Sequence, residues 1–241
     1  MKSPRETLRI RRGHGTVSFY KGCSSESGKT ETYLSRKDPS FPGLALKYCA
    51  NRLKKALENQ RCVLLKNPEK YDPEYIERLL EDLEAIFGEM MPPAFSSCKT
   101  YIRQWETAVY TKNPLVVPGQ RLYKTAKGDL VRSKLEMIIA DILFQLGIPY
   151  RYEAAVTLAD GSIRYPDFTI LCPSTRKLYY LEVCGMMDDP SYVDSLLNKL
   201  HGYSESGIIE GDNLLLVFEN HSVGFDPDDF KRMLFVNGIL Q

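Results

Sequence analysis

The chain has 241 residues, of which 43% are apolar and 26% charged, with a formal net charge of +1. This composition is that of a globular protein, and it excludes a disordered, collagenous or membrane-embedded chain. No apolar run approaches the roughly 18 residues of a spanning helix, and no apolar stretch follows the basic N-terminus as in a secretory signal. We therefore expect a cytoplasmic protein without a membrane partner.

The charges are distributed unevenly along the chain. Residues 1–50 contain ten Lys/Arg and four Asp/Glu, a balance of +6, whereas residues 201–241 contain two and seven, a balance of −5. A basic first half suits a polyanionic partner such as nucleic acid, although such charges often only solvate a surface. The six cysteines include no CxxC pair, so neither a zinc ribbon nor a disulfide framework is predicted.

The first half reads as a β-hairpin followed by helices. Residues 16–21 and 30–36 flank the turn-rich CSSESG, and amphipathic helical patterns follow at residues 44–64, behind Asp72-Pro73, and around Tyr101, Trp105, Ala108 and Val109. GCSSESGKT resembles a phosphate-binding loop, but five residues separate its glycines where the Walker motif has four. It also joins two strands rather than a strand and a helix, so nucleotide binding is not predicted.

The second half begins with a helix and continues with strands. The predicted order is a helix over residues 130–146, strands over 152–158, 163–171 and 178–184, a helix from Asp189-Pro190 to about residue 206, a strand over 214–219, and a last helix from Asp226-Pro227. This order of helix, three strands, helix and strand predicts an α/β domain over residues 119–241. Residues 1–118 then form an N-terminal hairpin and helical region.

Two carboxylates face each other across one predicted hairpin. If the loop from Cys172 to Lys177 is symmetric, paired residues sum to 349 and Asp167 lies opposite Glu182. Opposed β-carbons are about 4.5–5.5 Å apart, where two bare carboxylates repel by roughly 3 kcal/mol at an effective dielectric of 20. Such a pair requires a cation, a shared proton or a basic side chain, and a one-residue slip in register would separate it.

A third acid, Glu136, lies on the preceding helix at the edge of its apolar face. Its spacing alone leaves a solvent-exposed position open, but a helix packed on the sheet would direct Glu136 toward the face that carries Asp167 and Glu182. Three carboxylates suit a hard divalent ion, Mg²⁺ or Mn²⁺, because such ions prefer oxygen ligands.

These residues carry a resemblance to a known family. Glu136 in VRSKLEMIIAD, Pro166-Asp167 in RYPDFTI and Glu182 in YLEVCGMMDDPSY resemble the motifs of the PD-(D/E)XK nucleases, the restriction-endonuclease-like superfamily. The likeness covers roughly residues 120–220, and it is similar to a bacterial branch that places a helical region ahead of the nuclease core. The resemblance implies a restriction-endonuclease-like core with a mixed sheet. It also implies metal-dependent hydrolysis of nucleic acid by a DNA endonuclease or nickase, with RNA left open.

The sequence departs from the family pattern two residues after the third-motif acid. The usual lysine is replaced by Cys184, and a thiol cannot supply a permanent positive charge. In several branches a lysine on the following helix takes this place, and Lys199 in SLLNKLHGY is the matching residue, with Tyr203 one turn later. Lys199 has the alternative of being an ordinary surface lysine. In that case the fold would be a non-catalytic nucleic-acid-binding or assembly module.

The resemblance also implies a role for each site residue. Asp167, Glu182 and the backbone carbonyl of Val183 would hold the metal, and Glu136 would complete the site or bind a second ion. Lys199 would position the nucleophile or stabilise the transition state. The candidate nucleic-acid contacts are Lys127, Arg132, Lys134 and Tyr203, and the alternative for the three cations is ordinary surface charge. A third hypothesis is a scaffold that oligomerises through the apolar stripe at residues 46–63, which leaves a homodimer open.

Overall fold

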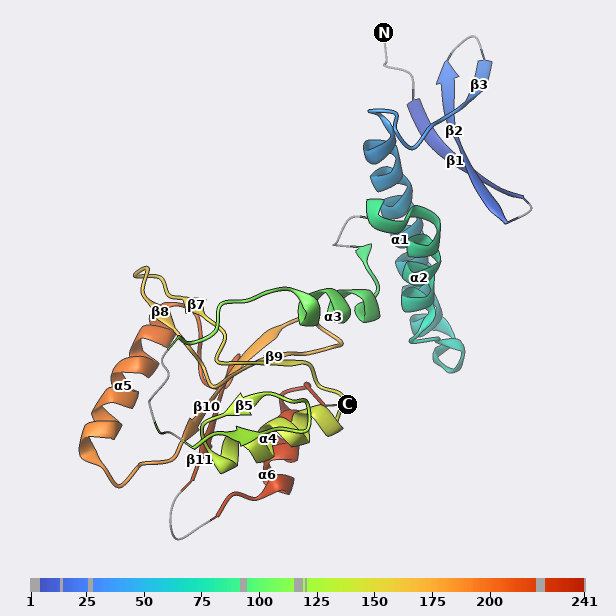
Figure 1. The fold of residues 1–241 in the computed structure, drawn as a ribbon. Coiled ribbons are helices and arrows are strands. Elements are labelled where there is room, and N and C mark those ends of the chain that lie inside the picture. The colour runs from blue at the N-terminus through green and yellow to red at the C-terminus, as the bar shows by residue number, and fades with distance from the viewer. Residues whose placement is uncertain are drawn as a thin grey trace. The chain divides into compact units, whose positions relative to one another are not determined.

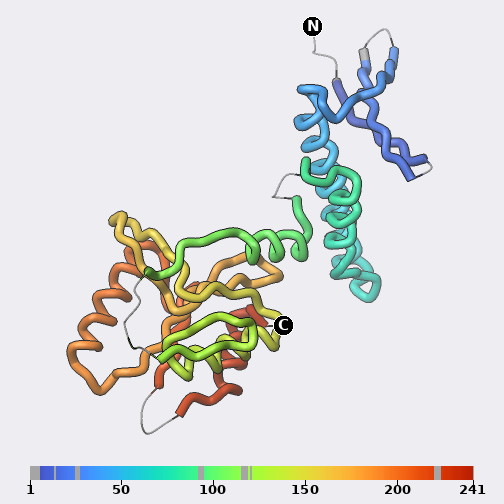
Figure 2. Tube along the Cα trace, viewed as in Figure 1, coloured from blue at the N-terminus to red at the C-terminus, as the bar shows by residue number. Residues whose placement is uncertain are grey.

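The computed structural model describes residues 5–13, 15–25, 28–91, 95–114, 119, 121–219 and 224–240. The chain divides into two compact units, residues 1–101 and 102–241 (Figures 1 and 2). In the part of the chain described, no helix is long and apolar enough to cross a membrane.

The boundary between the units lies earlier than the sequence predicts. The predicted boundary after residue 118 falls outside the described residues. Residues 111–113 already belong to the second unit, because Lys112 forms a β-bridge with Ala154 and the Asn113 amide donates to the Glu153 carbonyl at 3.1 Å. Residues 111–113 therefore pair, in the manner of a short strand, with residues 153–155 of the second unit.

The first unit combines a three-stranded antiparallel sheet with helices. The sheet order is β1 (Arg5–Gly13), β2 (Thr16–Ser25) and β3 (Gly28–Tyr33). Helix α1 (Phe41–Lys66) follows, then the short turn η1 (Pro68–Lys70), helix α2 (Tyr75–Phe87), the turn η2 (Gly88–Met90) and helix α3 (Cys98–Thr107), which crosses the boundary between the units. The predicted hairpin of β2 and β3 is confirmed. β1 adds a third strand, which was not predicted because its many arginines obscure the alternating apolar pattern of a strand.

The core of the first unit lies between one face of this sheet and α1 and α2. Leu8 and Phe19 point inward from the sheet, and the Phe19 ring packs edge-on against Phe41 at 4.9 Å between centroids. In the predicted stripe of α1, Cys49 and Ala56 are buried in the core of the first unit, whereas Leu46 is 45% exposed. The prediction for α3 was partly wrong, because the helix ends at Thr107 and leaves Val109 fully exposed.

The second unit is built on a mixed four-stranded sheet. Its order is β11 (Leu214–Phe218), β10 (Leu178–Cys184), β9 (Phe168–Leu171) and β6 (Tyr150–Tyr152), with β10 and β11 parallel and the other neighbours antiparallel. Helix α4 (Lys134–Gln145) precedes β6, α5 (Pro190–Glu205) joins β10 to β11, and α6 (Pro227–Val236) follows. Among the elements of this sheet, the predicted order of helix, three strands, helix and strand is confirmed, while β7 and β8 form a separate two-stranded sheet.

Three predicted elements are shorter than their sequence patterns. The helix expected from residue 130 begins at Lys134, because β5 (Leu130–Val131) first pairs with β4 (Tyr123–Lys124). The strand expected over 152–158 is broken at Glu153, whose φ is +46°. The strand expected over 163–171 divides into β8 (Ile163–Arg164), which pairs with β7 (Val156–Thr157), and β9.

Helices cover the two faces of the mixed sheet (Figure 1). One face carries Phe168, Ile170 and Leu181, and it packs against the buried side of α4 and against α6. The opposite face carries Tyr180, Leu214 and Leu216, and it packs against Leu200 and Tyr203 of α5. Because side chains alternate along a strand, Glu182 shares the α5 face with Tyr180.

Candidate active site

The pairing of β9 with β10 fixes the positions of the two strand acids. The register pairs Leu171 with Leu178, Thr169 with Tyr180 and Phe168 with Leu181, so the predicted sum of 349 is confirmed over these pairs. Asp167 directly precedes the last pair. Beyond that point the Val183 amide has no β9 backbone partner, and it donates to Asp167 Oδ2 at 2.7 Å.

Glu182 is a buried carboxylate bound by two side chains of α5. Only 3% of its surface is exposed. Lys199 Nζ lies 2.5 Å from its Oε2, and the Tyr203 hydroxyl donates to its Oε1 at 2.6 Å. Lys199 and Tyr203 are one helical turn apart, so both reach the same strand residue. Of the two arrangements open from the sequence, the structure shows Lys199 directed to the carboxylate.

The Asp167 carboxyl binds a proton much more tightly than an ordinary aspartate does. Burial raises its pKa to about 8, and repulsion from Glu182 adds to this effect. Lys199 and the bond from the Val183 amide act in the opposite direction, and Glu136 contributes a smaller increase. Burial is the largest of these effects, so the Asp167 carboxyl favours its protonated form over a wide pH range.

Cys184 cannot replace the missing lysine by its own charge. Burial and the two neighbouring acids raise the pKa of its thiol to about 12. The thiol is therefore neutral at physiological pH.

Glu136 approaches the site from a different direction than expected. It completes a capping box with Ser133 at the start of α4, and its Oε2 accepts from the Arg132 amide at 2.9 Å and from the Tyr152 hydroxyl at 2.6 Å. The expectation that α4 aims Glu136 at the Asp167–Glu182 face was wrong, because α4 packs on the opposite face of the sheet. Glu136 accepts a hydrogen bond from Tyr152, the last residue of β6, and its charge still contributes to the raised pKa of Asp167.

A divalent ion fits the chemistry of these donors but not their present contacts. Within the described ranges, no three His, Cys, Asp or Glu side chains form a group that could hold a metal ion. Lys199 and Tyr203 bind both oxygens of Glu182, and the hydrogen bonds of Glu136 converge on its Oε2. Asp167 Oδ1 and Glu136 Oε1 lie outside these hydrogen bonds. Carboxylate oxygens are the ligands that Mg²⁺ and Mn²⁺ prefer, so the described donors fit such an ion by their chemistry but are not arranged around one in this structure.

The Val183 carbonyl, the predicted backbone ligand, lies beside the same cluster. The Tyr192 hydroxyl is 3.5 Å from it, and this carbonyl follows directly on the strand from Glu182. The β9 ladder ends before Val183, so its carbonyl is not committed to that strand.

Four residues were predicted to contact nucleic acid, and the structure separates them. Lys127 donates to the Tyr150 carbonyl at 2.8 Å, at the opposite end of β6 from the carboxylates. The Arg132 guanidinium pairs with Glu153 at 3.0 Å, and Lys134 is exposed on the first turn of α4. Tyr203 must be corrected, because its side chain has no exposed surface and cannot contact a nucleic acid in this conformation.

Sequence reasoning missed one acid near this group. Glu153 is 9% exposed. Its carboxylate pairs with Arg132 and accepts a hydrogen bond from the side-chain amide of Asn113 at 3.4 Å. Burial raises its pKa, and the Glu136 carboxylate adds to the increase. In the sequence Glu153 reads as one more residue of the strand YEAAVTL, and only its break in backbone direction distinguishes it.

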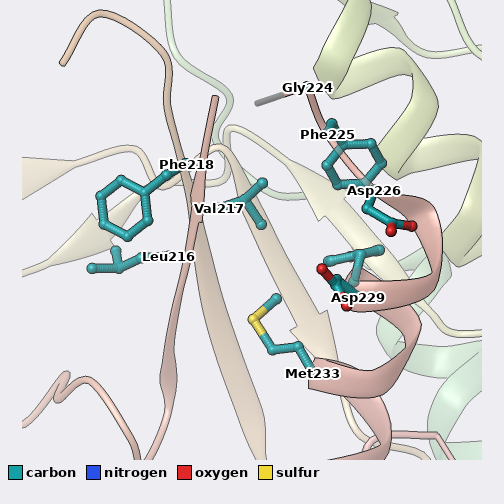
Figure 3. Close-up of a pocket in the computed structure, with 9 residues that line it drawn as sticks. Leu216, Val217, Phe218, Gly224, Phe225, Asp226, Asp229 and Met233 are labelled. Atoms are coloured by element: carbon teal, nitrogen blue, oxygen red, sulfur yellow. The ribbon is translucent and has the colours of Figure 1, made fainter. Parts of the chain in front are cut away.

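One cavity lies away from Glu136, Asp167 and Glu182. It has a volume of about 600 Å³ between β11 and α6, and Figure 3 shows Val217, Phe225 and Met233 around it, with Asp229 on the helix. None of the predicted catalytic residues lines it.

Comparisons with protein-family models, with curated proteins and with solved structures find no match for this chain.

Proposed function

We propose that the second unit has a restriction-endonuclease-like core that hydrolyses phosphodiester bonds in nucleic acid, as a Mg²⁺- or Mn²⁺-dependent DNA endonuclease or nickase. The observation that carries this proposal is the contact of Lys199 with Glu182 next to Asp167. Through this contact, helix α5 supplies a lysine to Glu182. The position two residues after Glu182, where the family has its usual lysine, is Cys184.

In this proposal Asp167, Glu182 and the Val183 carbonyl hold the cation, with Glu136 completing the site. A bound ion would lower the pKa of a water molecule and neutralise charge on the phosphate. Lys199 is the group that donates to the attacking water or to the phosphate oxygens. Its side chain is 27% exposed, so a substrate can reach the ammonium group. Tyr203 keeps the Glu182 carboxylate oriented while Lys199 exchanges partners.

The second candidate is a nucleic-acid-binding or assembly module that keeps this fold without turnover. The occupied oxygens of Glu182 favour it, because Lys199 and Tyr203 already satisfy this acid without a metal. The two candidates differ in whether a divalent ion displaces Lys199.

Cleavage assays with matched variants separate these candidates. Wild type, Asp167→Asn and Lys199→Ala are incubated with supercoiled plasmid, single-stranded DNA and RNA, with Mg²⁺, Mn²⁺ or EDTA. Asp229→Asn on α6 removes an acid elsewhere and serves as the control. We expect metal-dependent cleavage of DNA by the wild type and the control, and its loss in the other two. Metal binding without cleavage would support the second candidate, and cleavage by Asp167→Asn at the wild-type rate would exclude the proposed site.

A further inference from the structure

The outer face of the β1–β2–β3 sheet in the first unit has the features of a binding surface. Leu8 and Phe19 point into the core, so the alternate residues of these strands point outward. The register places Arg9, Tyr20 and Tyr33 side by side in one row across the three strands. Figure 1 shows α1 and α2 on one side of this sheet.

The two tyrosines present aromatic surface to the solvent. Tyr33 is 70% exposed, an unusual amount for a large ring on a sheet. The rings of Tyr20 and Tyr33 meet edge to face, with 6.0 Å between their centroids. The Arg11 guanidinium lies 4.5 Å from the centroid of Tyr20. A cation stacked on one ring next to a second, open ring is a favourable site for a flat aromatic group.

A shallow hollow adjoins this row. It has a volume of about 250 Å³, and Arg9, Gly22 and Lys29 are among the residues that line it. Gly22 keeps it open, because a β-carbon there would lie 3.0 Å from the Thr7 hydroxyl and 3.5 Å from Arg9 Nε. Arg9 and Lys29 therefore border this recess together with Glu31.

The charge of this face suits a polyanion. Arg9 and Arg11 are 55% and 64% exposed, and both pair with Glu31, at 3.3 Å and 3.1 Å. Glu31 therefore holds the two guanidinium groups in place, and together with Lys29 they leave this face positive. Proteins that bind single strands combine such cations with aromatic rings on which bases stack.

We propose that the outer face of the β1–β2–β3 sheet binds single-stranded nucleic acid, with a base stacked on Tyr33 and phosphates beside Arg9, Arg11 and Lys29. A duplex does not fit this arrangement as well, because its bases are already stacked on each other. The proposal is independent of hydrolysis in the second unit.

The test is fluorescence anisotropy of the full chain in EDTA, with labelled single-stranded DNA and RNA of about 15 nucleotides and with duplex DNA. EDTA prevents metal-dependent cleavage, so a failure here is distinct from a failure of the proposed nuclease activity. We expect Tyr33→Ala to weaken single-strand binding by about 5- to 160-fold, the range for loss of one stacked base. Tyr33→Phe keeps the ring and should bind as the wild type does.

Substitutions of the acidic and the basic residues on this face should change the affinity in opposite directions. Glu31→Gln should tighten binding because it removes the carboxylate that competes with phosphate. Arg11→Gln should weaken binding and reduce the slope of log affinity against log salt by about 0.7. Lys54→Gln, an exposed change on α1, is the control and should have little effect.

Three results would overturn the proposal. These are tighter binding of the duplex than of both single strands, wild-type affinity of Tyr33→Ala, or equal losses in Tyr33→Ala and Tyr33→Phe. Circular dichroism melting of each variant checks the fold, and the gain expected for Glu31→Gln cannot arise from unfolding. The DNA and RNA arms identify which single strand is preferred.

Discussion

Lys199 and Glu182 form a partly buried ion pair between helix α5 and strand β10, with 2.5 Å between Nζ and Oε2. The carboxylate is almost inaccessible to water, whereas the lysine side chain keeps 27% of its surface exposed. A charge in such a position must be paired, since an isolated one is costly. Lys199 therefore stabilises the metal-free fold in addition to its proposed part in catalysis, and experiments have to separate these two roles.

The first prediction concerns the loss of this lysine. Lys199→Met keeps the length of the side chain but leaves Glu182 without its cation, which should lower the free energy of unfolding by about 3–5 kcal/mol without metal. Mg²⁺ should restore part of the loss, because the ion replaces the missing charge. Urea denaturation in EDTA and in Mg²⁺ measures both effects.

Lys177→Met is the matched control for that experiment. Lys177 pairs with Asp212, but both side chains are more exposed, at 37% and 62%. Such a surface pair contributes about 0–1 kcal/mol. If Lys199→Met destabilises the protein no more than Lys177→Met does, Glu182 does not depend on Lys199 for its charge.

The second prediction is a pH dependence of stability. Burial and repulsion from Glu182 raise the pKa of Asp167 from 3.8 in the unfolded chain to about 8 in the fold. The folded state therefore binds this proton more tightly. Asp167 favours folding at low pH, and this contribution is lost as the pH rises from about 4 through about 8. Asparagine does not titrate, so Asp167→Asn should gain stability relative to the wild type over that range.

Thermal unfolding of both proteins in EDTA, from about pH 5 to about pH 9, measures this difference. The melting temperature of Asp167→Asn should move upward relative to the wild type as the pH increases. A difference that stays constant with pH would mean that Asp167 does not titrate in this window.

The elements that could be predicted are those with a strong local pattern. The apolar run LYYLEVC and the turn-rich PSTRK define β10 and its hairpin, and a symmetric loop then sets the register that brings Asp167 beside Glu182. Helices α5 and α6 begin at Asp189-Pro190 and Asp226-Pro227. In each, the aspartate side chain accepts a hydrogen bond from a backbone amide in the first turn. The Lys199 contact could be anticipated from helical spacing and the family resemblance.

The remaining features depend on tertiary packing. The periodicity of α4 shows which side of the helix is buried, but not which face of the sheet the helix covers. For this reason the predicted direction of Glu136 was wrong. A left-handed Glu153 has no local signal, because aspartate, asparagine or glycine is more usual there. Tyr203 was assigned to nucleic acid because helical spacing places it near Lys199, but spacing does not reveal burial.

The third prediction links metal binding to protons. With a pKa of about 8, most Asp167 carboxyl groups are protonated at neutral pH, and a cation that binds there must displace the proton. The apparent affinity for Mg²⁺ should therefore increase with pH up to about 8 and then level off. Calorimetry in two buffers with different ionisation enthalpies measures the released proton. Equal heats in both buffers would contradict a role of Asp167 as a ligand.

The fourth prediction tests whether Tyr203 positions Glu182. Tyr203→Phe keeps the buried ring and removes only the hydroxyl that donates to Glu182 Oε1 at 2.6 Å. Burial and the negative Glu182 raise the pKa of this phenol, so it remains a donor at every physiological pH. A hydrogen bond to a charged group contributes about 1.5–3 kcal/mol, and we expect a loss of stability of that size.

Tyr179→Phe is the control, because the Tyr179 hydroxyl donates to a neutral acceptor, the Asn237 carbonyl at 2.9 Å, from the opposite face of the strand. It should cost about 0.5–1.5 kcal/mol and leave Mg²⁺ affinity unchanged. If Tyr203 orients the carboxylate for a metal, Tyr203→Phe should weaken Mg²⁺ binding in calorimetry while Tyr179→Phe does not. Loss of stability in both variants with unchanged metal affinity would make Tyr203 a structural residue, and Glu182 would then be oriented by the strand and Lys199 alone.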